Sequence, residues 1–341
     1  MKPLLEKLKG KFAKDIVSVG LDIGTSQIKL VKMKFTKDVV ELCDFCVVDV
    51  LPDLSGALEL VAKHQELKIV NISFCGPSTT IRYINSPKMS HDELRKSLKF
   101  EAQKYIPFSV AEVNLDAAIL KSDLPDNKML VAIAAVKKDF LNQRIKLFET
   151  SGFKIGVVDI DSLSLINAFN FNFSKNTATH PKTVSLLNIG STFSSLNILD
   201  DGMPVLSRDI DIAGNGFTKK IAETLSLDFK NAEELKVNPD QDRISKVTKA
   251  VESTMSALAS EIRVSFDYYE SQSASVVSKI FVSGGGSLFP GLKDSLKVLL
   301  GIEVDYWDPL GQIGIAGHID SEKLKQISSQ LAVAVGLSLR P

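Results

Sequence analysis

The chain has 341 residues, of which 44% are hydrophobic, enough for two domains or for one large two-lobed domain. Lysine plus arginine and aspartate plus glutamate both number 41, so no net charge draws the chain to nucleic acid, and a nucleic-acid partner is not expected. No apolar stretch approaches the roughly 20 residues of a membrane-spanning helix. Three cysteines are too few for a disulfide framework, which favours a cytoplasmic location.

Residues 1–15 form a separate N-terminal arm. Leu4, Leu5, Leu8 and Phe12 recur there near helical spacing among lysines. Such a segment either touches an anionic membrane surface or is a frayed or docked arm, and the sequence leaves both interpretations open.

The first unit of the chain alternates between apolar strands and one short helix. A hairpin and a third strand precede a helix and two further strands, a pattern typical of a mixed sheet covered by helices in an α/β protein. The expected strands are residues 16–22, 27–35, 39–50, 68–76 and 79–87, and the expected helix is 55–64.

A different pattern begins at Ser90. The letters "SHDE" are a capping box, with Ser90 as N-cap and Glu93 at the third helical position, and an apolar stripe then continues until Pro107 ends the helix. Two strands and a helix follow, between two parts of the first unit. We therefore interpret residues 89–156 as an inserted subdomain.

The opening hairpin is repeated in the second half. "VGLDIGTSQIKLVKM" begins at Val19, and "SLLNIGSTFSSLNIL" begins at Ser185, so that Asn188 stands 166 residues after Asp22. This spacing indicates an internal duplication. The expected first lobe comprises residues 16–88, 157–182 and 325–341, and the expected second lobe comprises residues 183–324.

Both hairpin turns have the composition of a phosphate-binding turn. Glycine lets a backbone approach a phosphate closely, hydroxyls add donors, and a lysine adds a point charge. Asp22, at the end of its strand, is placed to hold a hydrated Mg²⁺. Either turn alone is an ordinary β-hairpin turn, but two of them and a third glycine-rich element favour a nucleotide between the halves. The candidate phosphate ligands are Gly24, Thr25, Ser26, Lys29, Gly190, Ser191 and Thr192.

Five motifs in this order resemble the actin-like ATPases, the superfamily of actin, the DnaK chaperones, sugar kinases and FtsA, and within it the PilM family of type IV pilus assembly. The motifs are "VGLDIGTSQIKLVK", "KFEAQKYIPFSVAEVNLDAAIL", "LLNIGSTFSSLNIL", "FVSGGGSLFPGL" and "LAVAVGLSLRP". The resemblance implies an actin-like α/β fold, a duplicated RNase H-like fold of two lobes with an FtsA-type subdomain inserted in the first. It implies ATP with Mg²⁺ as the ligand.

The resemblance also implies roles for individual residues. Gly284, Gly285 and Gly286 match the adenosine turn. Gly214 and Gly216 match a glycine pair beside the nucleotide, and Glu233 and Lys236 match a pair that grips ribose or base, although a solvated ion pair explains them equally. Asp22 matches the aspartate that holds the metal through water.

Two departures from the family pattern weaken the expected chemistry. Asn188 replaces an aspartate on the metal side, and Asp161, the best match to the catalytic water-positioning residue, is one methylene shorter than glutamate. We therefore expect ATP binding with slow or absent hydrolysis.

The expected partner, again by resemblance, is the N-terminal cytoplasmic peptide of PilN, bound in a groove beside the inserted subdomain. Pilus platform and motor proteins are expected neighbours, and the chain is then peripheral to the inner membrane. Tyr105, Ile106, Pro107 and Phe108 either form a wall of this groove or pack the core of the subdomain itself.

Two alternatives of the same fold remain at the level of sequence. One is a small-molecule kinase or ATPase, against which Asn188 argues. The other is a filament-forming protein like FtsA, which ends in an amphipathic tail, whereas this chain ends at Pro341 directly after the last expected core helix. Self-association is left open.

Overall fold

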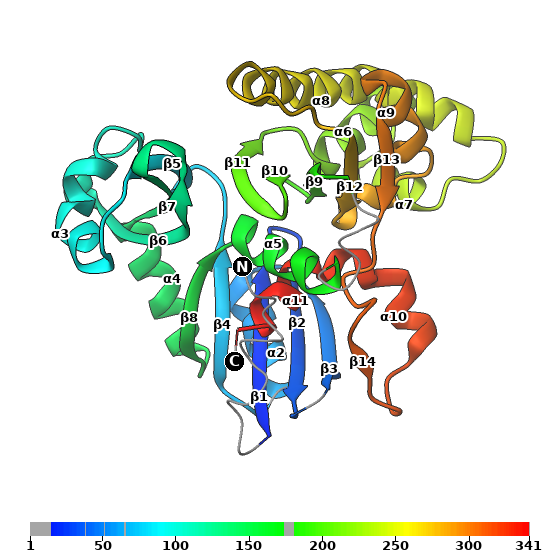
Figure 1. The fold of residues 1–341 in the computed structure, drawn as a ribbon. Helices are drawn as coiled ribbons and strands as arrows, with labels where there is room; N and C mark the ends of the chain where they lie inside the picture. Colours follow the sequence, from blue (N-terminus) through cyan, green and yellow to red (C-terminus); the bar gives the residue numbers. More distant parts are fainter. Residues whose placement is uncertain (1–14, 38, 51, 65, 174–180, 341) are drawn as a thin grey trace.

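The computed structural model describes residues 15–37, 39–50, 52–64, 66–173 and 181–340, so the expected N-terminal arm, apart from Asp15, lies outside the described residues. Two mixed sheets covered by helices form two lobes, and a smaller third sheet stands beside them (Figure 1). Within the described ranges, no helix has both the length and the apolar character needed to cross a membrane.

The first lobe is built on a sheet with the strand order β14-β3-β2-β1-β4-β8. Strands β1, β2 and β3 pair antiparallel, whereas β4 and β8 are added in parallel. Leu21 of β1 and Leu30 of β2, which are cross-strand partners, are fully buried with Leu58 and Val61 of α2. The elements are β1 (Ile16–Ile23), β2 (Gln27–Phe35), β3 (Val40–Asp49), α2 (Leu54–His64), β4 (Ile69–Phe74), β8 (Lys154–Ile160) and β14 (Gly314–Ile315).

The second lobe is built on a sheet with the order β11-β10-β9-β12-β13. The predicted apolar stripe of its long helix α8, Leu258, Ile262, Phe266 and Tyr269, is buried against this sheet. The elements are β9 (Thr183–Ile189), β10 (Ser194–Asp200), β11 (Met203–Ile210), α6 (Gly214–Leu225), α7 (Phe229–Val237), α8 (Ile244–Gln272), β12 (Lys279–Ser283), η3 (Gly285–Leu288), α9 (Leu292–Leu300) and β13 (Glu303–Tyr306).

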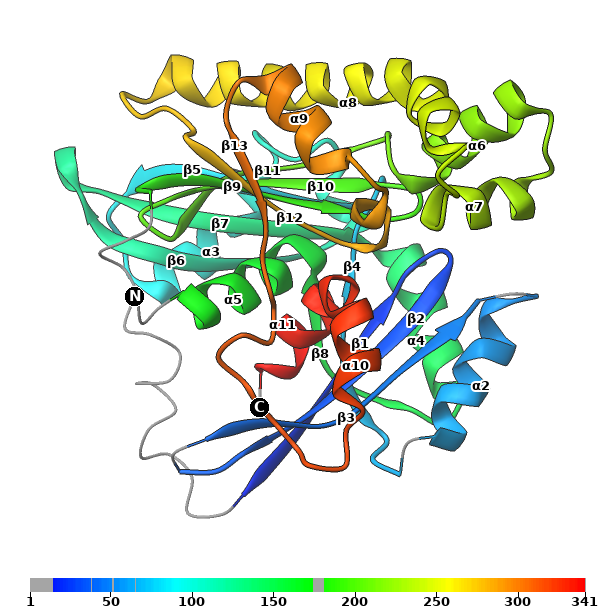
Figure 2. The ribbon, with the colours of Figure 1, turned by 90° about the vertical axis from the view of Figure 1, so that its right-hand side faces the viewer.

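The two sheets share one strand order. When β14 at the edge of the first sheet and the strands of the third sheet are set aside, the first sheet is β3-β2-β1-β4-β8 and the second is β11-β10-β9-β12-β13. In each, the third, second and first strands pair antiparallel, and the fourth and fifth are added in parallel. Figure 2 shows the sheet of the second lobe above α5 and α11, and the sheet of the first lobe below them. The predicted duplication is therefore confirmed at the level of topology.

The third sheet has the order β5-β7-β6 and carries α3 on one face. The predicted capping box is confirmed, since the Ser90 N–H donates to Glu93 Oε2 at 2.7 Å and the Glu93 N–H donates to Ser90 Oγ at 3.3 Å. Helix α3 ends at Ala102, five residues before Pro107. The elements are β5 (Thr79–Pro87), α3 (His91–Ala102), η1 (Val110–Glu112), β6 (Val113–Leu124), η2 (Pro125–Asn127) and β7 (Lys128–Lys137).

The structure shifts the expected boundaries of the inserted subdomain, 89–156. Strand β5 precedes residue 89 yet pairs with β7 along its whole length, so it belongs to the third sheet. Helix α4 (Lys138–Thr150) buries Leu141 and Phe148 in the core of the first lobe. Strand pairing, which a local pattern does not reveal, places the third sheet at residues 79–137.

The chain also returns to the first lobe earlier than the expected residue 325. Strand β14 pairs in parallel with β3, and Leu324 of α10 (Ser321–Ile327) is buried with Leu42 and Val31 of the first sheet. A two-residue strand has no periodicity, which explains why the sequence pattern does not reveal this return.

Two helices fill the space between the sheets. Helix α5 (Asp161–Phe173) and helix α11 (Ala332–Ser338), which follows η4 (Ser328–Leu331), pack against each other. Helix α11 also packs against β1 of the first sheet, and α5 against β10 of the second. Two glycines permit the close approach. A Cβ atom on Gly336 would stand 1.7 Å from Ser164 O in α5, and one on Gly20 would stand 2.2 Å from Ala334 O.

We predict that Gly336→Ala lowers the free energy of unfolding by about 3 kcal/mol or more, because the backbone of α5 has to move to admit a methyl group. Urea denaturation measures this change. Gly317→Ala is the matched control, since nothing lies within 4 Å of a Cβ there. Equal midpoints for the two variants would contradict the packing described here.

Candidate functional site

Two matching turns lie where the lobes meet. In the first, Gly24 N–H donates to Gln27 O at 3.0 Å, and in the second, Gly190 N–H donates to Phe193 O at 3.0 Å. A Cβ atom on either glycine would stand 2.8 Å from that same carbonyl oxygen. Glycine is thus required at both positions for one geometric reason. We call residues 24–26 the first turn and residues 190–193 the second turn.

The two turns touch through side-chain hydroxyls. Thr25 Oγ1 lies 2.6 Å from Ser191 Oγ and 2.7 Å from Thr192 Oγ1. The third member of the first turn, Ser26, accepts a hydrogen bond from Val50 N–H through its carbonyl. The structure therefore brings the predicted phosphate ligands of both lobes together, in direct contact.

The charges on the two hairpins differ. Asp22 and Lys29 are cross-strand neighbours, and Lys29 Nζ lies 3.1 Å from Asp22 Oδ2 with both side chains mostly buried. The same positions of the second hairpin hold Asn188 and Ser195. Asn188 Oδ1 accepts a hydrogen bond from Ser283 Oγ at 3.1 Å. The ion pair thus exists in the first hairpin and has a neutral counterpart in the second.

Asp161 begins α5 at the edge where the parallel strands β1, β4 and β8 end, an edge that binds ligands in many α/β sheets. Burial, and after it the negative charge of Asp22, raise the pKa of Asp161 to about 7, although the Ser73 and Cys75 side chains act in the opposite direction. Burial also raises the pKa of the Cys75 thiol. The protonated form of Asp161 is therefore favoured more than that of an ordinary aspartate.

The glycines of the predicted adenosine turn pack on the second hairpin. Gly284 has φ +91°, and a Cβ on it would stand 2.4 Å from Ile189 O. A Cβ on Gly286 would stand 2.6 Å from Ile189 Cγ2 and 2.8 Å from Gly190 O. Gly285 faces Gln330 of the segment before α11. Three glycines in a row thus let η3 lie directly against the second turn.

The glycines at the start of α6 join the same cluster. Gly214 N–H donates to Gly190 O at 3.0 Å, and a Cβ on Gly214 would stand 3.5 Å from Gly286 Cα. Gly216 N–H donates to Ala213 O at 2.9 Å at the N-terminal end of α6. Glycines of three backbone segments therefore pack closely together at the second turn.

Glu233 and Lys236 lie on α7 facing α6. The Lys236 ammonium is buried and donates to Glu233 Oε2 at 2.7 Å, to Thr218 Oγ1 at 2.8 Å and to Gly214 O at 3.3 Å. Burial lowers the pKa of Lys236, while Glu233 raises it. The Glu233 side chain is 43% exposed, whereas the buried Lys236 anchors α7 to Gly214 at the start of α6.

Two residues at this junction, Asp209 and Phe193, were not expected from the sequence. Asp209, near the end of β11, accepts a hydrogen bond from Gly76 N–H at 2.8 Å, and the ring of Phe193 lies against Gly76. Burial raises the pKa of Asp209, and the Gly76 N–H lowers it. The run "RDIDIAGNG" around Asp209 is rich in charged residues and glycines, which is a sequence signal of a functional segment. Only the folded chain shows that Asp209 contacts the segment after β4.

The donor set suits a hydrated magnesium ion better than a bare one. Asp22 and Asp161 supply carboxylates and Asn188 supplies an amide, while no group of three or more His, Cys, Asp or Glu side chains in the described part of the chain could hold an ion directly. Magnesium in nucleotide sites keeps several waters and takes further oxygens from phosphates. The residues present fit that mode.

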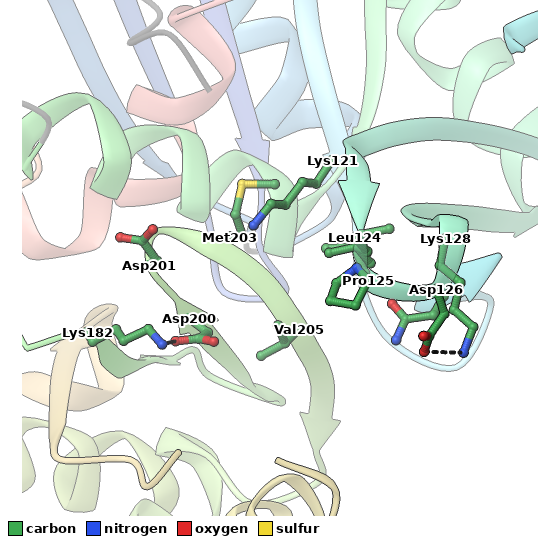
Figure 3. A pocket seen from close by; sticks show the side chains of 12 residues that line it. Lys121, Leu124, Pro125, Asp126, Lys128, Lys182, Asp200, Asp201, Met203 and Val205 are labelled. Atoms are coloured by element: carbon green, nitrogen blue, oxygen red, sulfur yellow. Dashed lines mark ion pairs between the residues drawn. The ribbon is translucent and has the colours of Figure 1, made fainter. Parts of the chain in front are cut away.

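A cleft of about 490 Å³ lies between the inserted subdomain and the second lobe. Figure 3 shows side chains from the ends of β6 and β7 facing side chains from the β10–β11 turn and β11. Lys182 Nζ lies 3.8 Å from Asp200 Oδ1, and Lys128 Nζ lies 3.9 Å from Asp126 Oδ2, and both lysines are exposed. The lining is completed by Asn85, Lys121, Leu124, Pro125, Leu130, Asp201, Met203 and Val205.

The predicted groove segment lies elsewhere in the subdomain. Ile106 is buried in the core of the third sheet, and Phe108 packs against that core. Tyr105 is 41% exposed, and none of Tyr105, Ile106, Pro107 and Phe108 is among the residues that line the cleft. Of the two interpretations open from the sequence, packing within the subdomain accounts for Ile106 and Phe108.

Two lobes of one strand order, with glycine turns meeting between them, define the chain as a protein of the actin-like ATPase fold. A family model described as "Type IV pilus assembly protein PilM" matches residues 20–341, and the chain therefore belongs to the PilM family of type IV pilus assembly proteins.

Solved structures support the same fold. A chain from a structure described as "PilM-PilN type IV pilus biogenesis complex" superimposes with a TM-score of 0.83 at 24% sequence identity, covering 95% of this chain and 98% of that one. The ethanolamine utilization protein EutJ from Carboxydothermus hydrogenoformans superimposes with a TM-score of 0.54 at 13% identity, covering 100% of this chain and 96% of that one. At these identities, the similarities show the fold.

We predict that Asp161→Asn raises the melting temperature at pH 8 by at least about 3 °C, measured without metal or nucleotide. The folded-state pKa of about 7 lies above the ordinary 3.8, so the folded chain retains a proton that the unfolded chain has lost. Wild-type stability accordingly falls as the pH rises from about 4 to about 7, and the variant lacks this loss.

Thermal melts from pH 4 to pH 8 measure the difference between variant and wild type, which should widen with pH. The exposed carboxylate of Asp211 provides the control Asp211→Asn. A difference that stays constant across this range would contradict a raised pKa at Asp161.

Proposed function

We propose that the chain is an ATP-binding scaffold of the type IV pilus assembly platform at the inner membrane, and that it binds the N-terminal cytoplasmic peptide of PilN. The observation that supports it most is the meeting of the two glycine turns, because a tight turn exposes backbone donors and hydroxyls to a phosphate from each lobe. Pilus platform and motor proteins are the neighbours of such a scaffold.

The residues of each lobe have separate tasks in this proposal. Lys29 and the hydroxyls of Thr25, Ser26, Ser191 and Thr192 hold the phosphates, and Asp22 holds Mg²⁺ through water. The glycines of η3 and α6, which pack closely on the second turn, lie on the adenosine side of the site, next to the Glu233–Lys236 pair. Magnesium would supply charge neutralisation between the phosphates, as it does in other nucleotide sites.

Slow or absent hydrolysis follows from the neutral second hairpin. Asn188 is engaged by Ser283 and offers no carboxylate to the water shell of the metal. Asp161 is one methylene shorter than glutamate, so its carboxyl reaches less far toward the water that attacks the γ-phosphate. ATP then acts mainly as a ligand that fixes the arrangement of the lobes.

The proposed peptide site is the cleft beside the inserted subdomain. A structurally similar chain is described as part of a PilM-PilN complex. The cleft combines apolar side chains such as Leu124 and Met203 with lysines and aspartates on both walls, a lining that suits an extended peptide with alternating apolar and polar residues. PilN would thereby tether the chain to the membrane.

We predict that Lys29→Ala weakens the binding of Mg-ATP at least tenfold, about 1.4 kcal/mol, because a buried point charge beside the phosphates is lost. Calorimetric titration measures the dissociation constant. Lys32→Ala, from the same strand, is the control and should bind as the wild type does. Equal affinities for both variants would contradict the proposed phosphate site.

We predict that Met203→Arg weakens binding of a synthetic PilN N-terminal peptide at least tenfold, because the larger cation fills the cleft. Val298→Arg places the same change on α9, where Val298 is 82% exposed, and should leave binding intact. Phosphate release followed in the same samples should not exceed about 10⁻³ s⁻¹. Absence of saturable peptide binding together with brisk phosphate release would overturn the scaffold proposal.

A further inference from the structure

Helix α3 lies on the outer side of the third sheet, at the left margin of the molecule in Figure 1. Its inner face buries Leu94, Leu98 and Ala102 in the core of the inserted subdomain. Since an α-helix has 3.6 residues per turn, Lys96 and Phe100 stand on the opposite face, and both are exposed. This outer face of α3 is therefore turned to solvent.

Two aromatic rings project from this outer face and its end. Of the aromatic side chains in the described part of the chain, Phe100 is the most exposed, at 69%. Tyr105 follows shortly after the last helical residue and is 41% exposed. An aromatic ring in water lacks the hydrophobic free energy that burial supplies. A surface that covers these rings would therefore be stabilised by their burial.

Cations surround the two rings. Arg95, Lys96 and Lys99 are exposed, and none of the three has an ion-pair partner among the described residues. Lys104 Nζ lies 4.8 Å from the centroid of the Phe100 ring. The whole chain is neutral, with 41 basic and 41 acidic residues, so this helix carries a local excess of positive charge.

The carboxylates of α3 do not cancel this charge. Asp92 and Glu93 lie in the first helical turn, and Glu93 is engaged by Ser90 in the capping box. Glu101 Oε1 lies 2.9 Å from Lys104 Nζ. One of the four cations is thus neutralised by a neighbouring carboxylate, and three are not.

Helix α9 shows the contrasting arrangement. It exposes Val298 and Leu299, but its lysines are paired, since Lys293 Nζ lies 2.9 Å from Asp305 Oδ1 and Lys297 Nζ lies 2.8 Å from a carboxylate of β13. Exposed apolar side chains therefore stand beside neutralised lysines on α9 and beside unpaired cations on α3.

We propose that the outer face of α3 binds an anionic phospholipid surface. The aromatic rings enter the layer between headgroups and acyl chains, and the long cationic side chains around them reach the lipid phosphates. This contact goes beyond the proposed function, in which only PilN tethers the chain to the membrane. The face consists of Arg95, Lys96, Lys99, Phe100, Lys104 and Tyr105.

The shape of this face favours lipid over an acidic protein. The face is the convex side of a single helix, and the cleft of about 490 Å³ is lined by other residues. A protein partner holds an aromatic anchor in a matching pocket and meets each cation with a placed carboxylate. A bilayer offers a plane of phosphates over an apolar layer, which a projecting ring and flexible lysines can use without a fixed geometry.

The test is sedimentation of the full chain with lipid vesicles, without nucleotide or peptide, so the result does not depend on the proposed function. Mixed phosphatidylglycerol–phosphatidylcholine vesicles should bind the wild type at least about tenfold more strongly than phosphatidylcholine vesicles do. Salt at about 1 M, where the Debye length is about 3 Å, should abolish this difference. Residues 1–14 are present in every sample, so any lipid affinity of that arm is common to all.

Charge reversal tests the cations. The double variant Lys96→Glu with Lys99→Glu should weaken binding to the anionic vesicles at least about tenfold. Lys246→Glu with Lys249→Glu is the matched control, because it reverses two exposed lysines at the same spacing on α8 and changes the total charge equally. The control should bind as the wild type does, and melting curves establish that both variants are folded.

Two substitutions test the ring. Phe100→Ser should weaken binding at least about threefold, whereas Val264→Ser, at a position 57% exposed on α8, should not. The only tryptophan of the wild type, Trp307, is buried. Phe100→Trp therefore adds an exposed reporter, and its emission should move to shorter wavelength with anionic vesicles while that of the wild type stays unchanged.

Three results would overturn the inference. The first is equal binding by the α3 double variant and its α8 control, as expected if residues 1–14 alone bound lipid. The second is unchanged emission of Phe100→Trp in the presence of anionic vesicles. The third is binding of polyglutamate instead of vesicles, lost in the same α3 variants, which would indicate an acidic protein partner. None of these results bears on the proposed binding of ATP or of PilN.

Discussion

The contact between the two turns is the interaction on which the arrangement of this protein depends. Thr25 from the first lobe and Ser191 and Thr192 from the second meet hydroxyl to hydroxyl, 166 and 167 residues apart along the chain. The glycines on both sides are required by carbonyl oxygens less than 3 Å from the positions of their absent Cβ atoms. Since neutral hydroxyl pairs contribute only about 1 kcal/mol each, this junction can open when a better ligand competes for it.

The duplication has diverged in its chemistry while it kept its geometry. The first hairpin has a buried Asp22–Lys29 ion pair, and the second has Asn188 and Ser195 at the same register. Removal of a carboxylate leaves the turn able to donate hydrogen bonds but removes a group that would organise metal-bound water. A second lobe that binds phosphate without assisting hydrolysis suits a scaffold, because a scaffold acts while its ligand stays bound.

Local patterns in the sequence predicted much of the fold, and long-range pairing explains what they missed. The hairpins, the capping box at Ser90 and the stripe along α8 depend on neighbouring residues and are confirmed. The assignment of β5 to the third sheet and the pairing of β14 with β3 depend on partners about 50 and 270 residues away, which no local periodicity records. Asp209 was missed for the same reason, because its partner is a backbone N–H 133 residues earlier.

The most direct measurement is the distance between Thr25 Oγ1 and Thr192 Oγ1 in a crystal structure of the chain with Mg²⁺ and a non-hydrolysable ATP analogue. The distance is 2.7 Å here. The account predicts that phosphate oxygens lie between the turns and that this distance grows by several ångströms, since a phosphoryl group needs a hydrogen bond on each side. An analogue bound elsewhere, with the two hydroxyls still in contact, would contradict it.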